Sequence, residues 1–146
     1  MAYSPGLSSI KIIELEIELE RLMMRMRVCQ SGNADKIHQS YQQIIEECQK
    51  NDRDLQKRIE GCRSPAVAEL SKAQLTYCKS TEQLLSEKLA AFLHSSETTP
   101  TEDRLEALAL YAEYAVDFAV QAVRHAQLAS LASASAELNQ LKPDES

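Results

Sequence analysis

The chain has 146 residues, which is enough for one domain. Apolar residues make up 44% and charged residues 26%, a mixture that is typical of globular proteins and not of disordered ones. The net charge of −6 disfavours nucleic-acid binding, because that binding depends on basic side chains that neutralise phosphates. We therefore expect a folded domain with no nucleic-acid partner.

The sequence also disfavours a membrane partner. Its longest uncharged run, residues 126–136, is rich in serine and shorter than the stretch of about 18 apolar residues that crosses a bilayer. The beginning of the chain lacks the basic start and apolar core of a signal peptide. The four cysteines form no C-x-x-C pair and suit reduced thiols, so we expect a cytoplasmic protein.

Glycine and proline mark the ends of four predicted helices. They occur only at Pro5, Gly6, Gly32, Gly61, Pro65, Pro100 and Pro143. Because both residues break helices, the long stretches between them favour helix over about residues 8–30, 33–60, 64–94 and 99–141. The loops are short, so we predict an all-α fold, with one domain over residues 1–146. It is an antiparallel up-down-up-down four-helix bundle with a long Ala-rich C-terminal helix.

Local sequence signals support these boundaries. Gly32 is placed to end the first helix, and Asn33 to cap the second. Ser64 followed by Pro65 is typical of a helix start. The run Thr99-Pro100-Thr101-Glu102 reads as a capping box. Apolar stripes on the second and third helices favour an ordinary hairpin, with the members Tyr41, Ile45, Cys48, Leu55, Ile59 and Cys62, then Val67, Leu70, Tyr77, Cys78, Leu84, Leu85, Leu89 and Phe92.

The first predicted helix has two apolar faces when its residues are placed 100° apart. One face carries Ile12, Leu15, Leu19, Leu22, Met26 and Cys29, and the other carries Ile10, Ile13, Ile17, Met24 and Val28. Two faces predict two partners and hence a homo-oligomer; the alternative is one wide face that contacts two neighbours in a single bundle. Apolar residues alternate with glutamates over residues 13–20, so a strand is the competing local prediction there.

Charges on this helix are ordered, with glutamates before arginines. Such an order complements the helix dipole and allows pairing along the surface, and we prefer that explanation to contact with lipid or with an acidic partner helix.

The fourth predicted helix carries a seam of small side chains. Its members follow a 4–3 spacing: Leu108, Ala112, Ala115, Ala119, Ala122, Ala126, Ala129, Ser133 and Ala136. We expect this helix to be the most buried and the seam to pack against a helix of the same chain; packing against a second copy is the alternative. Beyond about Ala129 little of the bundle remains to pack on, so Leu131 and Leu138 are further candidates for an interface.

No motif predicts a catalytic, cofactor or metal site. A ferritin-like metal centre needs two Glu-x-x-His pairs, and the nearest match is Asp35-x-x-His38 on one helix. Cys48 and Cys78 lie fifteen residues from Arg63 on either side, so a thiol pair is a candidate; two small core residues are the more common arrangement. We therefore expect no cofactor and no enzymatic activity.

The function indicated by these features is a non-enzymatic interaction module of the scaffold, adaptor or chaperone-like kind. We expect it to bind a second copy of itself and also to be able to bind another protein. The alternative is a bundle that binds a small ligand or a metal, with a pocket among Tyr77, Tyr111, Tyr114 and Phe118.

Overall fold

The fold is all-α. A computed structural model describes the backbone of residues 6–141 and the side chains of residues 9–140. These residues form four helical stretches, and no strand occurs among them. Residues 13–20 lie within the first helix, so the competing prediction of a strand there is wrong.

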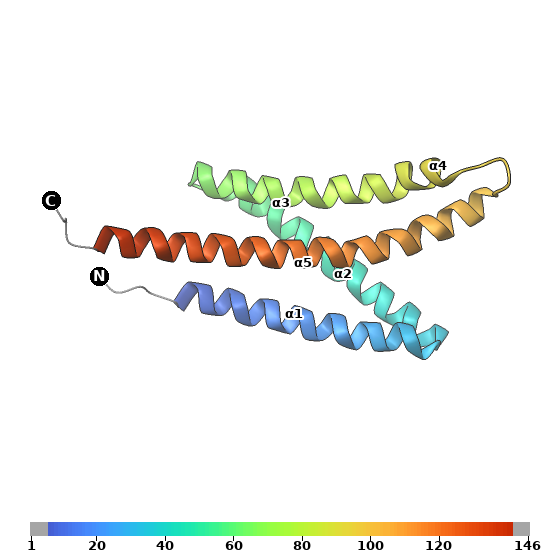
Figure 1. Cartoon of the computed structure of the whole chain (residues 1–146), viewed down its shortest axis with the longest axis horizontal. Helices are drawn as coiled ribbons and strands as arrows, with labels where there is room; N and C mark the ends of the chain where they lie inside the picture. Colours follow the sequence, from blue (N-terminus) through green and yellow to red (C-terminus); the bar gives the residue numbers. More distant parts are fainter. Residues whose placement is uncertain (1–5, 142–146) are drawn as a thin grey trace. The chain divides into compact units, whose positions relative to one another are not determined.

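The helix boundaries agree with the prediction to within a few residues. The first two helices are α1 (Gly6–Ser31) and α2 (Ala34–Gly61). The third stretch comprises α3 (Pro65–Gln83), the π-helical turn η1 (Leu84–Lys88) and α4 (Leu89–Leu93). The last helix, α5 (Pro100–Leu141), is continuous over 42 residues (Figure 1). The sequence predicted a regular helix through the third stretch and missed the π turn.

Helix termini form as the local signals predicted. Gly32 has a φ of +66°, a left-handed conformation that glycine adopts without steric cost and that ends α1. The Asn33 side chain accepts a hydrogen bond from the backbone N–H of Lys36 at 3.2 Å. The Thr99 hydroxyl accepts one from the N–H of Glu102 at 3.2 Å and so caps α5.

The chain divides into two compact units, with the boundary between Thr76 and Tyr77 inside α3. In the first unit, α1 and α2 are joined by a short turn, fold back on each other and are in contact (Figure 1). Leu55 of α2 and Ser71 of α3 are its buried residues among those described. The up-down-up-down order of all four helices and the single domain stay predictions.

In the second unit, α4 and η1 contact α5 across the connection formed by residues 94–99 (Figure 1). The buried residues there are Asp103 and Ala107, with 3% and 1% of their surfaces exposed. The half-buried positions that continue this stripe along α5 are Leu110, Tyr111, Ala115 and Phe118. The fully buried residues of α5 therefore lie in its first turns, and only Val123, Ala134 and Glu137 are half-buried among the described residues of its second half.

This protected stripe lies on a different face of α5 from the seam of small side chains that begins at Leu108. Leu108 directly follows Ala107, and one residue turns an α-helix by about 100°. Apart from the half-buried Ala115, the members of the seam are exposed. Within the second unit, the expectation that the seam packs as the main buried surface of α5 is therefore wrong, because α4 and η1 meet α5 on the neighbouring face.

Several predicted core residues also lie in solvent. Tyr41 of α2 and Leu70 of α3 are 59% and 67% exposed, and Phe92 of α4 is 81% exposed. On α2 the protected positions include Ile37, Ile44 and Ile45. The apolar spacing therefore located the correct helices but not always the face that becomes buried.

Candidate interaction surface on the first helix

Helix α1 keeps its apolar side chains in solvent. Of residues 9–31, only Arg25 and Val28 are half-buried, and the others are exposed. The exposed fraction reaches 58% for Ile10 and 63% for Met24. A helix that covered a core with one face would show a continuous protected stripe, and α1 shows none.

Both predicted apolar faces share this exposure. On the first face, Ile12 is 54% and Leu15 38% exposed. On the second face, which we call the isoleucine face (Ile10, Ile13, Ile17, Met24 and Val28), Ile13 is 55% and Ile17 43% exposed. Val28 is half-buried, unlike the other members, because it lies near the turn where α2 begins. Contiguous apolar surface of this kind is typical of sites where proteins meet.

One ion pair fixes the side of α1 that meets α2. A guanidinium nitrogen of Arg25 donates a hydrogen bond to Oε1 of Glu47 at 2.8 Å. This hydrogen bond lowers the pKa of the Glu47 carboxyl and raises the pKa of Arg25, in each case against a smaller opposing effect of burial. Both partners keep contact with water, so the pair orients the two helices more than it stabilises them.

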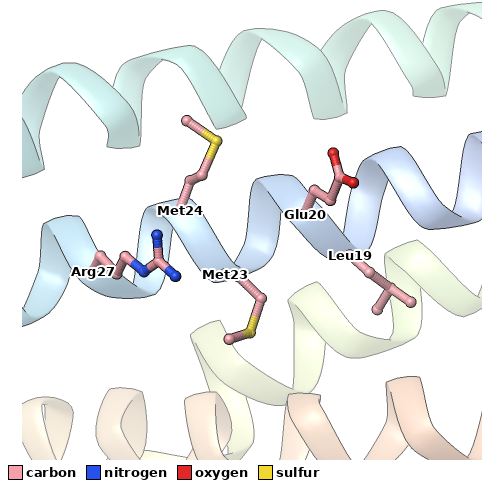
Figure 2. A pocket seen from close by; sticks show the side chains of 5 residues that line it. All are labelled: Leu19, Glu20, Met23, Met24 and Arg27. Atoms are coloured by element: carbon pink, nitrogen blue, oxygen red, sulfur yellow. The ribbon is translucent and has the colours of Figure 1, made fainter.

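The other side of α1 is hollowed. An open depression of about 400 Å³ is lined by Leu19, Glu20, Met23, Met24 and Arg27 (Figure 2). Met23 and Met24 point to opposite sides of the helix, and Glu20 projects toward the same side as Met24 (Figure 2). Methionine side chains are flexible and polarizable, so they adapt to irregular partner surfaces. Sequence reasoning omitted Met23, which lies at the edge between the two apolar faces.

The end of α5 provides the second predicted surface. Leu131 and Leu138 are 70% and 61% exposed, and Leu128 on the same helix is 68% exposed. The helix continues unbroken to Leu141, whose side chain lies outside the described residues. All the α5 residues predicted for an interface whose side chains are described are thus accessible.

The two cysteines proposed as a thiol pair lie on different helices. Cys48 is an exposed residue of α2, and Cys78 is a half-buried residue of α3. Cys48 belongs to the first unit and Cys78 to the second. Their pairing stays a prediction.

Several positions considered for metal and ligand binding are open to solvent, although Tyr111 and Phe118 are half-buried. Asp35 and His38 are both exposed, and within residues 9–140 no three His, Cys, Asp or Glu side chains are grouped so that they could hold a metal ion. Of the aromatic residues considered for a ligand pocket, Tyr77 and Tyr114 are each 54% exposed. Such exposure leaves a small apolar ligand in contact with water instead of enclosing it.

A histidine–aspartate pair, which sequence reasoning missed, joins α4 to α5. Nδ1 of His94, just after α4, lies 2.6 Å from Oδ2 of Asp103 in the first turn of α5. Hydrogen bonding from the Thr98 side chain and then from His94 lowers the pKa of Asp103, against the opposing effect of its burial. The Thr98 hydroxyl has one proton and also lies 3.2 Å from the Ser95 carbonyl oxygen, so the two acceptors compete for it.

When Thr98 donates to Ser95, Oδ1 of Asp103 is buried without a donor. The contact of His94 with Asp103 does not depend on Thr98, because Nδ1 lies within hydrogen-bond distance of Oδ2 whichever acceptor the Thr98 hydroxyl bonds. The pair joins the end of α4 to the first turn of α5, beside the turn residues Ser95 and Thr98.

The comparisons with known proteins find no relative of this chain. Models of protein families, curated protein sequences and solved structures were all searched, and none of them matches this chain. Among the described residues, no helix combines the length and the apolar character that crossing a bilayer requires.

Proposed function

We propose that this protein is a non-enzymatic helical interaction module that self-associates through α1, in the cytoplasm, where its thiols stay reduced. The observation that carries the proposal is the exposure of large apolar side chains along α1, which exceeds 50% for Ile10, Ile12, Ile13, Met23 and Met24. A second protein can use the same kind of surface, so the module suits a scaffold or an adaptor.

The free energy available from this surface is substantial. Full burial of one Ile or Met side chain contributes about 1.5–3 kcal/mol relative to full exposure. Since the residues of the isoleucine face are already partly covered, each gains a fraction of that value on association. Several such contributions together are needed to offset the lost translational and rotational freedom of the two partners.

Sedimentation equilibrium over a range of protein concentrations tests this proposal. The unmodified protein is expected to form dimers or larger species, and the variant Ile13→Asp/Ile17→Asp is expected to sediment as a monomer. The variant Val67→Asp/Leu70→Asp is the matched control, because it charges two residues of α3 that are 48% and 67% exposed. It is expected to keep the mass of the unmodified protein.

Two results would contradict the proposal. One is an unmodified protein that remains a monomer at every concentration. The other is a variant at Ile13 and Ile17 that stays helical by circular dichroism and associates as strongly as the control. Charging Leu131 and Leu138 in the same assay measures the share contributed by the end of α5.

A further inference from the structure

The helix dipole does not explain the order of the charged residues along α1. Four glutamates, at positions 14, 16, 18 and 20, precede three arginines, at positions 21, 25 and 27. The first turn of α1 contains no acid and the last turn no base. Because the helix dipole acts mainly within the first and last turns, it gives little reason for an order that begins two turns inside the helix.

The apolar residues of α1 share a midpoint with these charges. Ile17 and Met24 lie at equal distances along the helix from the point between Glu20 and Arg21. Ile13 and Val28 are likewise equidistant from that point. A two-fold axis through it superimposes one apolar face on another copy of itself, running in the opposite direction.

We propose that the exposed isoleucine face of α1 is covered by α1 of a second copy, antiparallel to the first, with the two-fold axis between Glu20 and Arg21. This inference rests on the proposed function and specifies its partner and geometry. Ile17 of each copy then lies opposite Met24 of the other, and Ile13 opposite Val28.

Charge complementarity selects this direction. In an antiparallel pair the same flank of both helices meets, and two residues along a helix correspond to about 3 Å. Within that offset, Glu16 meets Arg27 of the second copy on one flank, and Glu18 meets Arg21 of the second copy on the other. A parallel pair would instead place the glutamate segments of the two helices beside each other and the arginine segments beside each other, which is repulsive.

The contacts that α1 makes within the first unit leave this surface available. Arg25 already bonds Glu47 of α2 and is not needed for the pairing. Arg21 reaches Glu18 of its own helix at 2.9 Å, an exposed contact that a second copy can share. Glu20 and Arg27 line the depression on α1, so the flank that carries Glu16 and Arg27 is open.

Charge reversal tests the pairing in the full-length protein. The variant Arg21→Glu/Arg27→Glu and the variant Glu16→Lys/Glu18→Lys each place like charges at all the flank contacts of a homodimer. Each is expected to self-associate about tenfold or more weakly than the unmodified protein by sedimentation equilibrium, and an equimolar mixture of the two is expected to recover dimers. The variant Lys72→Glu/Lys79→Glu on α3 is the control for altered charge alone, because it makes the same change in net charge as Arg21→Glu/Arg27→Glu at two exposed positions outside α1.

Helix direction is measured separately. A spin label at Lys11→Cys, in a chain whose four native cysteines are replaced by serine, lies off the isoleucine face. Electron–electron distance measurements are expected to give a long distance for the antiparallel pair, because its labels are separated by about 28 Å along the helices as well as across them, whereas a parallel pair has no axial separation and gives a shorter distance set by the helix spacing and the two label side chains.

The outcomes separate this inference from the proposal on which it rests. A dimer that persists in both charge variants, or a short distance between the labels, overturns the antiparallel α1 pairing and leaves self-association through another surface. An unmodified protein that stays monomeric overturns both.

Discussion

Nδ1 of His94 lies 2.6 Å from Oδ2 of Asp103, so the end of α4 is tied to the first turn of α5 by one short contact. Asp103 is 3% exposed, whereas the His94 side chain is 56% exposed. The carboxylate is thus enclosed by the fold while its partner stays in reach of solvent.

The variant Asp103→Asn is expected to change how the thermal midpoint depends on acid pH. The pKa of Asp103 is lower in the folded protein than its ordinary value of 3.8, so the unfolded chain binds the proton more readily. The stabilisation is present above pH 3.8 and is lost as the pH falls through the lower folded value. Tm measured between pH 5 and pH 2.5 is therefore expected to fall less steeply in the variant.

The variant Asp35→Asn is the control for this experiment, because Asp35 is an exposed carboxylate in the first turn of α2. Equal acid slopes for Asp103→Asn and the unmodified protein would show that the ionised carboxylate of Asp103 does not stabilise the fold.

Replacement of Leu55 by alanine is expected to cost about 2–5 kcal/mol of unfolding free energy, measured by urea denaturation. Leu55 is 3% exposed, so its removal leaves a cavity that the surrounding helices fill only in part. The variant Tyr41→Ala on the same helix starts from a residue that is 59% exposed and is expected to change stability far less. A loss of similar size at both positions would contradict the assignment of the buried face of α2.

Two alanines of α5 are expected to respond differently to enlargement. Ala107 is 1% exposed, so Ala107→Leu forces a larger side chain against α4 and η1 and is expected to cost about 1–3 kcal/mol. Ala112 belongs to the exposed seam, so Ala112→Leu is expected to be tolerated within about 0.5 kcal/mol. The opposite ranking in thermal unfolding would restore the seam as the packing surface.

Alanine substitutions at Gly32 and Gly61 are expected to differ in effect, because only Gly32 has a left-handed backbone conformation. Gly32 has a φ of +66° with open space around it, so Gly32→Ala is expected to destabilise by about 1–2 kcal/mol through backbone conformation alone. Gly61 has no positive φ and also faces open space. Gly61→Ala is therefore expected to be neutral or to stabilise by up to about 1 kcal/mol, measured by urea denaturation. Destabilisation of equal size at both positions would contradict this distinction.

The sequence was sufficient for the helices and their ends, because glycine, proline and capping residues act over a few positions. Gly32, Asn33 and Thr99 each form the local interaction that their chemistry predicts. Burial was harder to predict, since it depends on which neighbour approaches. Phe92 and Ala112 fit an apolar stripe equally well whether that stripe is covered or not, and both are exposed.

The candidate interaction surface was predictable where it depends on one helix and not where it depends on contacts between helices. The isoleucine face and the ordered charges of α1 are properties of one helix and can be read from its residues. The pair formed by His94 and Asp103 joins residues on either side of a loop, and its burial depends on how the chain turns between them. No spacing rule marks that contact in advance.

The π turn at Leu84–Lys88 has a consequence for the length of the third helical stretch. The N–H of Leu89 bonds the carbonyl oxygen of Leu84, five residues back, where a regular α-helix would bond four residues back. The turn thus accommodates one residue more than a continuous helix needs. A chain shortened by one residue here would keep the flanking faces in phase and carry an unbroken α-helix, so this turn is the place where the helix tolerates a change in length.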